Sequence, residues 1–524
     1  MFFLSLAGGL VFCSLLFWGS YFVFSFYLVE WSFVSYKISY LFNWCFFSFI
    51  LLLVTLSVMI FSSYYLAGEL NFIYYYFMLV VFVGSMFSLN YSSNGFSMLM
   101  SWDLLGISSF FLVLFYNNWD SCSGAMNTVL TNRVGDFFIF VFFSGVVYSG
   151  AYFLSLSYFF IFVPVWLMLA AFTKSAQFPF SGWLPKAMSA PTPVSSLVHS
   201  STLVTAGLIL ILNFGEILFY LNISFLLLFS GVFTMCFSSL AALVEEDMKK
   251  VVALSTLSQM GFAMTTVGLG LNFVSFIHLL SHALFKSCLF MQVGLIIHCS
   301  MGQQDGRGYS GLGGLPYLIQ LQLLVTLFCL CGLIFSSGAV SKDFILEFFF
   351  SGGSGLVLSG FFFFSIFLTF GYSYRLWKGF FLSFNKGVLF SHGSKLMNFL
   401  SGVLVLFSVM YLWWLNSNLL CVPSLYLYSD FFVPLFYVFV LLFLSFFVWK
   451  LLLKEFVYKF IVDFVAKMGA KTLVFSGFSD LLLNSFNSKG YYFLSGGGIF
   501  SGGLMKNLGF SPLVFIFLLI FLML

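Results

Sequence analysis

The amino-acid sequence predicts an all-α polytopic membrane protein, and its composition and apolar pattern carry that prediction. Of its 524 residues, 62% are hydrophobic and only 7% are charged, whereas a soluble domain has about a quarter of its residues charged. The apolar runs last about 20 residues, which is enough to cross a hydrocarbon core of about 30 Å. They do not alternate every second residue, as the strands of a membrane barrel do. The dispersed net charge of +4 excludes a nucleic-acid-binding surface.

We expect about fifteen transmembrane helices joined by connections too short to hold a water-soluble domain. The first span has no basic segment and no small-residue cleavage site, so it is interpreted as a retained helix and not as a signal peptide. The expected spans cover approximately residues 2–28, 41–66, 71–90, 96–116, 127–149, 156–178, 190–214, 221–243, 249–270, 272–299, 316–350, 354–377, 398–416, 429–449 and 507–524.

Residues 450–490 differ from the rest of the chain because six lysines alternate there with apolar residues at helical spacing. A helix that is charged on one side and apolar on the other lies along a membrane interface and does not cross the bilayer. The Gly/Ser-rich residues 495–503 are typical of a flexible joint. The sequence therefore predicts a long lateral amphipathic helix and joint at 450–506, followed by a terminal transmembrane anchor at 507–524.

Ionisable side chains inside the spans are the candidates for function, because burying a charge in hydrocarbon is costly. Asp103 lies roughly 10 Å into its span, and its side chain is too short to reach back comfortably to the interface. Arg133 and Asp136 are three residues apart and share a helix face. The alternative to a functional role for this pair is a local ion pair near a helix end.

Lys174 precedes two prolines, Pro179 and Pro185, that interrupt its span. A lysine near a helix end can extend its ammonium group to the interface. The prolines, however, free backbone carbonyls that need partners inside the protein, and an interrupted helix that carries a lysine is a recurrent form of ion site in transporters. His199 follows among hydroxyl side chains that could relay a proton, although a single histidine is more often a hydrogen-bonded core residue.

His278, His282 and Lys286 recur every four residues, so they share one face of a predicted helix. Two histidines at this spacing need a third ligand to bind a metal, and none is near in sequence. A polar proton path is therefore favoured over a metal site and over a hydrogen-bonded core. The nine cysteines include no C-x-x-C pair, so we expect no metal or redox centre in this chain.

Lys342 and Asp343 follow Gly338, which interrupts another apolar run. One interpretation is a short surface loop; the other is an interrupted helix in which Lys342 is the counterpart of Lys174. The two lysines are 168 residues apart, with five spans in each unit. Duplication of this kind is typical of inverted repeats that hold an ion site at the helix break.

Several long motifs resemble the antiporter-like subunits of respiratory complex I, most closely the distal, proton-pumping one. The similarity is dense from about residue 40 to residue 377, and the motifs are long enough to make a chance match remote. The motifs are KSAQ (174–177), GWLPKAMSAPTPVSSLVHSSTLVTAG (182–207), DMKKVVALSTLSQMGF (247–262), HLLSHALFKSCLFMQVGLIIH (278–298), QDGRGYSGLGGLP (304–316), SKDFILE (341–347) and YSYR (372–375).

The resemblance implies a role for each residue singled out above. The family's paired carboxylate and lysine fall on Asp103 and Lys174, and its exit-side lysine falls on Lys342. The family usually has a glutamate where this chain has Asp103, so the carboxylate here is one methylene shorter. The proton-transfer groups that the resemblance implies are Asp103, Lys174, His199, His278, His282, Lys286 and Lys342. The supporting ion-pair residues are Arg133, Asp136 and Asp343.

The resemblance also implies how the chain is organised, with broken helices inside two inverted five-helix repeats. The expected parts are N-terminal transmembrane helices (1–70), the first and second repeats (71–214 and 215–377), C-terminal transmembrane helices (378–449), the lateral helix with its joint (450–506) and the terminal anchor (507–524).

We therefore expect a multi-pass subunit of the mitochondrial inner membrane that moves protons while other subunits carry electrons from NADH to ubiquinone. The resemblance implies that FMN, iron–sulfur clusters and ubiquinone bind to partner subunits and that this chain binds no cofactor. The expected partners are the sister antiporter-like chains 4 and 2, contacted by the lateral helix, and phospholipids. Three alternatives stay open: a stand-alone cation/proton antiporter, a non-pumping structural subunit of the membrane arm, and a quinone-binding subunit.

Overall fold

The computed structural model describes residues 25–31, 34–39, 42–92, 95–148, 163–214, 223–309, 317–332, 337–338, 341–342, 345–346, 356–382 and 401–409. The chain forms two units, Met1–Val438 and Phe439–Leu524, and every described residue belongs to the first. The predicted lateral helix, the terminal anchor, the expected span at 429–449 and most of that at 2–28 lie outside the described residues.

Helices make up nearly all of the described part, which confirms the predicted all-α membrane fold. Among the described residues, seven helical spans are long and apolar enough to cross a membrane. The long helices are α2 (Phe42–Tyr65), α3 (Phe72–Tyr91), α4 (Gly95–Val113), α5 (Trp119–Tyr148), α6 (Val163–Lys174), α9 (Leu203–Asn213), α11 (Ile223–Val244), α12 (Met248–Gly268), α13 (Asn272–Cys299), α14 (Tyr317–Cys331) and α16 (Leu356–Trp377). The short ones are η1 (Leu114–Tyr116), η3 (Phe180–Gly182), α7 (Trp183–Lys186), η4 (Ala187–Ser189), α8 (Thr192–Val194), η5 (Ser195–Thr202) and η7 (Lys378–Leu382).

A β-hairpin near the N-terminus departs from the sequence prediction. The first expected helix extended to residue 28, but Ser25–Trp31 forms strand β1, which pairs antiparallel with β2 (Val34–Ser39). The predicted end of that helix is therefore wrong. The segments SFYLVEW and VSYKIS are rich in the aromatic and β-branched residues that favour strands.

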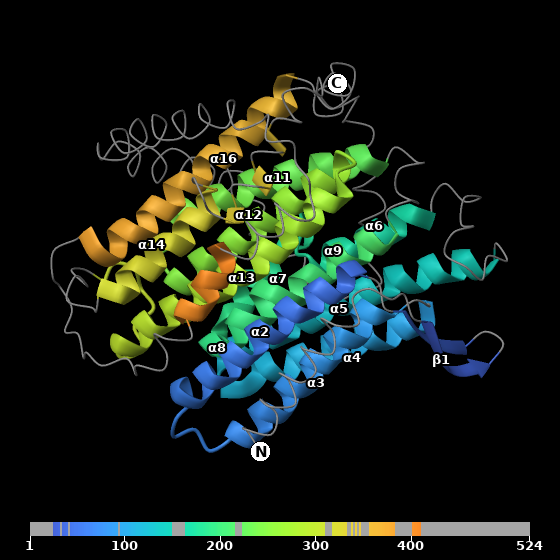
Figure 1. Cartoon of the computed structure of the whole chain (residues 1–524), viewed down its shortest axis with the longest axis horizontal. Coiled ribbons are helices and arrows are strands. Elements are labelled where there is room, and N and C mark those ends of the chain that lie inside the picture. Colours follow the sequence, from blue (N-terminus) through green and yellow to red (C-terminus); the bar gives the residue numbers. More distant parts are fainter. Residues whose placement is uncertain are drawn as a thin grey trace, which may run out of the picture. The chain divides into compact units, whose positions relative to one another are not determined.

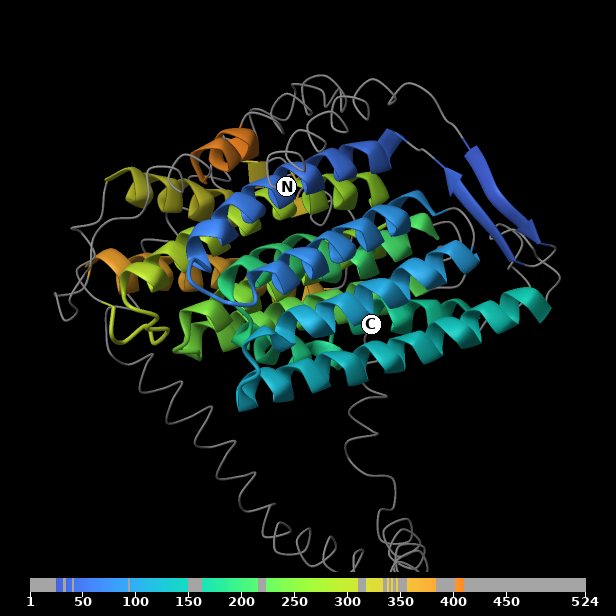
Figure 2. The same ribbon diagram turned by 90° about the horizontal axis from the view of Figure 1, so that it is seen from below.

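The long helices of this unit run side by side (Figures 1 and 2), and α13 is fully enclosed among them. It packs against α2, α12, α14 and η5, and it is buried along its apolar length, as is the segment from α8 to α9. By contrast, α3, α4 and α11 are only about half buried within this unit. Ionisable residues on α13 consequently face protein and not lipid.

Small residues allow α11 and α12 to pack closely. A Cβ atom placed on Gly261 of α12 would lie 3.0 Å from the carbonyl oxygen of Gly231 on α11. Glycines at a helix contact let two backbones approach in this way, which is a common means of packing in membranes. The contact fixes α12 beside α13 and α16, where its polar face meets the ionisable residues described below.

The segment from α8 to α9 is one continuous helical span with a π-helical part, η5, in its middle. Pro193 lies just before η5. Within η5, hydroxyl side chains donate hydrogen bonds to backbone carbonyls. Thr202 Oγ1, for example, donates a hydrogen bond of 2.8 Å to the carbonyl of Leu197. π-Helical turns are frequent at functional sites, and this one carries His199.

α14 ends earlier than the sequence indicated. The predicted break was Gly338, but Gly332 already leaves the helix with a φ of +75°, a conformation that favours glycine. Gly338 is in a helical conformation, and its backbone lies so close to the carbonyl of Cys329 that a Cβ atom would not fit. The chain thus turns back against α14 and brings Lys342 to the end of that helix.

Candidate functional site

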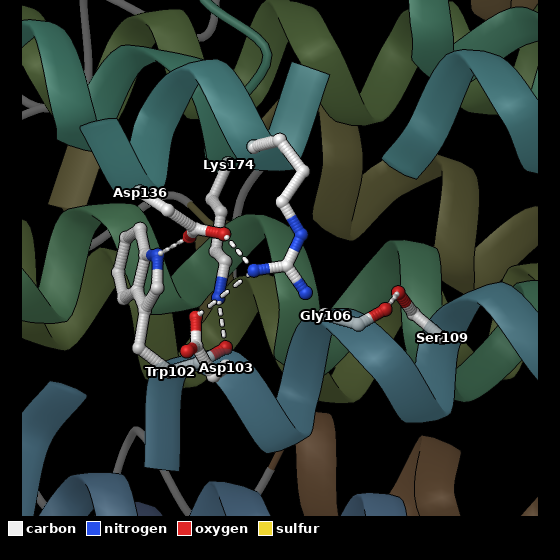
Figure 3. Close-up of polar contacts among 7 residues, drawn as sticks. Trp102, Asp103, Gly106, Ser109, Asp136 and Lys174 are labelled. Atoms are coloured by element: carbon white, nitrogen blue, oxygen red, sulfur yellow. Dashed lines mark hydrogen bonds and ion pairs between the residues drawn. The ribbon is translucent and has the colours of Figure 1, made fainter. Parts of the chain in front are cut away.

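Lys174 is the last residue of α6, and its side chain is fully buried. Its Nζ atom donates a hydrogen bond of 2.7 Å to the backbone carbonyl of Trp102 on α4. The same atom lies 3.7 Å from the centroid of the Trp102 ring, where the negative face of an indole attracts a cation. Figure 3 shows the lysine pointing between α4 and α5 toward this tryptophan.

Asp136 on α5 is the better buried of the two carboxylates in this cluster, with 8% of its side chain exposed. Trp102 Nε1 donates a hydrogen bond of 3.0 Å to Oδ1 of Asp136. Arg133 donates one of 3.0 Å to Oδ2. Hydrogen bonds to a charged carboxylate are stronger than those between neutral groups. Trp102 thus contacts both the buried lysine and the buried carboxylate.

Asp103 lies further out, with 35% of its side chain exposed. Its Oδ1 atom is 3.8 Å from Nη1 of Arg133, the same nitrogen that contacts Asp136. Among the described residues, no ion pair joins Asp103 directly to Lys174, although the resemblance assigns the carboxylate–lysine pair to these two residues. The short aspartate side chain reaches Arg133 instead, so the arginine contacts both carboxylates.

A second buried cluster surrounds His278, His282 and Lys286 on α13, all of them fully enclosed. Lys286 Nζ donates a hydrogen bond of 2.6 Å to Oγ of Ser255 on α12. His278 Nδ1 lies 3.0 Å from the hydroxyl of Ser341, and its ring packs 4.9 Å from that of Phe262. The direct hydrogen-bond partner of this lysine is therefore uncharged, as it is for Lys174.

Lys342 belongs to the same cluster. Its Nζ atom donates a hydrogen bond of 2.5 Å to the backbone carbonyl of Leu330 in the last turn of α14, and only 2% of the residue is exposed. The same Nζ atom lies 5.9 Å from the centroid of the Phe262 ring, which packs against His278. The structure thus brings together a lysine and two histidines of α13 with a lysine that follows in the chain by more than fifty residues.

His199 lies on η5, buried beside the ring of Trp183 at a centroid distance of 6.0 Å. Neither of its ring nitrogens has a hydrogen-bond partner in the described part of the protein, and the same is true of His282. η5 packs against α13, which carries the second cluster. Towards the first cluster, Trp183 donates a hydrogen bond of 2.9 Å to the carbonyl of Thr173, the residue before Lys174.

Ion pairs at the start of α12 form a third charged group, at a connection between helices. Arg307 lies 2.7 Å from Glu246 and 3.7 Å from Asp305, and Lys250 pairs with Asp247. Partial burial works against the charge of Asp247, but the hydrogen bond and charge of Lys250 outweigh it and hold the pKa of that carboxyl below its usual value. These pairs fasten the connection after α13 to the first turn of α12.

The family described as "NADH:quinone oxidoreductase/Mrp antiporter, TM" matches residues 92–369. NADH-ubiquinone oxidoreductase chain 5 of Ascaris suum is 68% identical over 95% of this chain and 91% of its own length. The corresponding chain of Caenorhabditis elegans is 65% identical over 94% of each. This chain belongs to the NADH-ubiquinone oxidoreductase chain 5 family.

Solved structures agree with the fold of this chain 5 family member. A chain of the Mrp complex from Dietzia sp. DQ12-45-1b superposes with a TM-score of 0.73 at 25% identity, over 98% of this chain and 58% of that chain. A chain of the membrane-bound sulfane sulfur reductase, an archaeal respiratory membrane complex, gives a TM-score of 0.69 at 18% identity, over 78% and 72%. The predicted antiporter-like fold is confirmed, and the chain 5 relatives indicate a multi-pass protein of the mitochondrial inner membrane.

The remaining residues that the sequence singled out in this chain 5 protein are Pro179, Pro185 and Asp343. Pro179 precedes η3, and Pro185 lies within α7, so both follow the end of α6 at Lys174. Asp343 lies outside the described residues. Within the part of the chain that the structure describes, no three His, Cys, Asp or Glu side chains gather as a metal site would need.

Sequence reasoning missed the neutral partners of the chain 5 lysines, above all Trp102, Ser255 and the carbonyl of Leu330. Uncharged residues do not stand out in a membrane helix, and a backbone carbonyl has no sequence signal at all. Only Trp102 offered one, because it directly precedes Asp103 in a span. Lys249, buried with its Nζ 3.5 Å from the carbonyl of Ala190, was missed as well.

Proposed function

We propose that this chain moves protons across the mitochondrial inner membrane through its buried lysines, histidines and carboxylates, as an antiporter-like subunit of complex I. The observation that carries the proposal is the buried ammonium of Lys174, held by Trp102 beside the Arg133–Asp136 pair. A buried ionisable group inside a membrane protein is functional by default, because its burial is costly. Electron transfer belongs to other subunits, which would bind FMN, iron–sulfur clusters and ubiquinone.

Proton release from Lys174 follows from the charges around it. Burial disfavours the ammonium form, whereas a nearby carboxylate favours it. When Arg133 pairs with Asp136, it neutralises the carboxylate that would stabilise the lysine proton. When Arg133 turns fully to Asp103, 3.8 Å away, Asp136 is released and supports the ammonium again. Movement of the Arg133 side chain between the two aspartates thus decides whether Lys174 keeps or releases its proton.

The released proton passes through His199 to Lys286 and from there past His278 to Lys342. Water completes this route, because buried imidazole nitrogens without protein partners normally bond to internal water. Moving one charge against 100 mV costs about 2.3 kcal/mol. Removing the partner of a buried charge costs about 3–5 kcal/mol, so rearranged ion pairs supply work of the right size.

The exposed side of Arg133 supports contact with a sister subunit. Arg133 lies midway along the 30-residue helix α5, with 53% of its side chain exposed. Leu130 and Phe137, also exposed, share its face. An arginine at this depth is too costly to face hydrocarbon, so a protein partner covers it. We assign this face to a sister antiporter-like chain, with the lateral helix at 450–506 as the second contact with chains 4 and 2.

Substitution of the lysines tests the proposal. Lys174→Met and Lys342→Met, each in the intact complex in sealed vesicles, should lower NADH-driven proton uptake by about 10-fold or more, since a pumping path needs each carrier. Lys250→Met is the matched control, because Lys250 is a half-exposed lysine outside both clusters. Normal pumping by both cluster variants would instead favour the structural-subunit alternative.

Similarity to a chain of an Mrp complex favours one alternative function, that of a stand-alone cation/proton antiporter. That function needs ion exchange by the isolated chain, with no electron donor. Proton movement in liposomes that depends on a sodium gradient would support it, whereas movement seen only in the assembled complex during NADH oxidation supports the proposal above.

A further inference from the structure

One face of α12 contributes to the hydrogen bonding of both lysines in the second cluster, Lys286 and Lys342. Ser255, Ser258 and Gln259 recur on this face, and all three are buried. Ser255 accepts the hydrogen bond from Lys286. Gln259 Nε2 lies 3.5 Å from the carbonyl of Leu330, the same oxygen that accepts the bond from Lys342. A single helical turn therefore contacts the hydrogen-bond acceptors of two ammonium groups.

Tyr372 of α16 fixes the middle of this turn. It is the first residue of the YSYR motif, which the proton path described above does not use, and it is fully buried. Its hydroxyl lies 3.2 Å from Oγ of Ser258. Ser258 Oγ in turn donates a hydrogen bond of 2.9 Å to the carbonyl of Ser255. With its own proton engaged there, Ser258 accepts the proton of the tyrosine hydroxyl.

The buried hydroxyl of Tyr372 needs a hydrogen-bond partner. Burying a hydroxyl in an apolar bundle costs free energy that only a hydrogen bond recovers, and a phenylalanine would fill the same space. The bond to Ser258 is thus the physical reason for a tyrosine at this position. It ties α16 to the turn of α12 that supports the ammonium of Lys286 and, through Gln259 and Leu330, that of Lys342.

We propose that Tyr372 is a positioning residue, whose hydroxyl holds Ser258 and thereby sets the distance between Lys286 and Lys342 for proton transfer. This inference rests on the proposed function of the two lysines. Without the hydroxyl, the 255–259 turn relaxes away from α16, and Lys286 loses its fixed acceptor. Proton transfer between the lysines then slows while the fold is kept.

Removing the same hydrogen bond from either side tests the proposal in the intact complex. Tyr372→Phe and Ser258→Ala should each lower NADH-driven proton uptake by about 3- to 10-fold, the factor expected for one neutral hydrogen bond, and should shift the pH at which uptake is half-maximal. The double variant should lose no more than either single one, because both remove one interaction. Ser258→Thr keeps a hydroxyl and should restore uptake. Tyr374→Phe, in the same motif but partly exposed, is the matched control.

Losses that add in the double variant, or normal uptake and an unchanged pH profile in Tyr372→Phe, would overturn the positioning role. Lys286→Met, measured in the same vesicles, separates this failure from a failure of the proposed function. If Lys286→Met abolishes uptake while Tyr372→Phe leaves uptake and its pH profile unchanged, only the inference about Tyr372 is wrong. If neither changes uptake, the proton path itself is wrong.

Discussion

At Lys174, a cation is kept inside a membrane protein by groups that carry no charge of their own. The Trp102 carbonyl accepts its hydrogen bond and the Trp102 ring faces it, while the nearest carboxylates are bonded to Arg133. A buried ammonium held by neutral partners gives up its proton more readily than one in a direct ion pair, because less electrostatic energy is lost on release. The same arrangement recurs at Lys286, with Ser255, and at Lys342, with Leu330.

Substitution of Trp102 tests the double role of this residue. Trp102→Phe keeps an aromatic ring and the backbone carbonyl but removes the donor to Asp136. We expect a loss of about 1.5–3 kcal/mol in stability, since hydrogen bonds to charged groups contribute more than those between neutral groups, together with several-fold slower proton uptake. Thermal denaturation of the complex and vesicle assays measure the two effects.

Trp119→Phe is the matched control for that experiment, because Trp119 begins α5 and is 89% exposed. Equal destabilisation by both substitutions would contradict a specific role of the Trp102 indole nitrogen.

At the scale of elements, helix breaks decide where the lysines lie. α6 stops at Lys174 before Pro179, and α14 stops at Cys331 before Gly332, so each break brings a lysine to a helix end. Backbone carbonyls near a helix end lack helical donors, and Lys342 supplies the missing hydrogen bond to Leu330 in the last turn of α14. Lys174 instead contacts the carbonyl of Trp102 in the middle of α4. That both lysines contact a backbone carbonyl agrees with the predicted internal repeat, which itself stays a prediction.

Gly332→Ala tests the second break. An alanine at a φ of +75° costs about 1 kcal/mol, and its Cβ atom would lie 2.7 Å from Cδ of Lys342. We expect lower stability and slower proton uptake, because the lysine must move from the Leu330 carbonyl. Gly360→Ala on α16, where a Cβ meets no atom within 4 Å, should leave both unchanged; an effect of equal size at Gly360 would argue against displacement of Lys342.

The ion pairs at the start of α12 predict a dependence on pH. Because the pKa of Asp247 is lower in the folded protein than in the unfolded chain, its pairing stabilises the fold above the unfolded pKa of about 4. The stabilisation is lost as the pH falls through the folded pKa. The protection of amide hydrogens in residues 303–309 against exchange, relative to the intrinsic rate at each pH, should therefore fall in acid.

Asp247→Asn supplies the comparison, because it removes the titrating group. In this variant the loop should exchange faster already at neutral pH, and acid should add no further opening. An acid-induced opening that persists in Asp247→Asn would assign the effect to another carboxylate, Asp305 or Glu246, both of which pair with Arg307.

At the scale of the whole molecule, the described helices divide into an enclosed centre and exposed sides. α12, α13 and the α8–α9 span are enclosed, whereas α4 and α11 expose large apolar residues. Exposed apolar residues alone do not distinguish lipid from protein, because both are apolar neighbours. The half-exposed Arg133 on α5 does distinguish them, since only a protein or water could solvate it.

Cross-linking tests which side meets a partner. A photoactivatable residue at Leu130 on α5, next to Arg133, should attach to a sister membrane subunit in the intact complex. The same probe at Phe229 on α11, also a large exposed apolar residue, serves as the comparison and should attach to phospholipid. Capture of phospholipid alone at Leu130 would contradict a sister subunit on this face of α5.

The spans and the ionisable residues could be predicted from the sequence because each has a local cause. Long apolar runs must be helical in a bilayer, and a charge inside one is conspicuous. The pairings could not be predicted so well. Asp103 was expected to face Lys174, but the folded chain places Arg133 against Asp103, and Asp136 is the carboxylate bonded to the tryptophan that holds the lysine. Which side chains meet depends on how α4, α5 and α6 rotate against one another.

By itself, the sequence determined the membrane class, the helical architecture, the family resemblance and the set of titratable residues. These properties follow from composition and from spacing along one helix, and short-range physics decides both. The tertiary structure alone decided which neutral atoms hold each lysine and where α14 ends. It also decided the contact between Tyr372 of α16 and Ser258 of α12. Such contacts join residues far apart in the chain, and their geometry is set by close packing of whole helices, which no local pattern encodes.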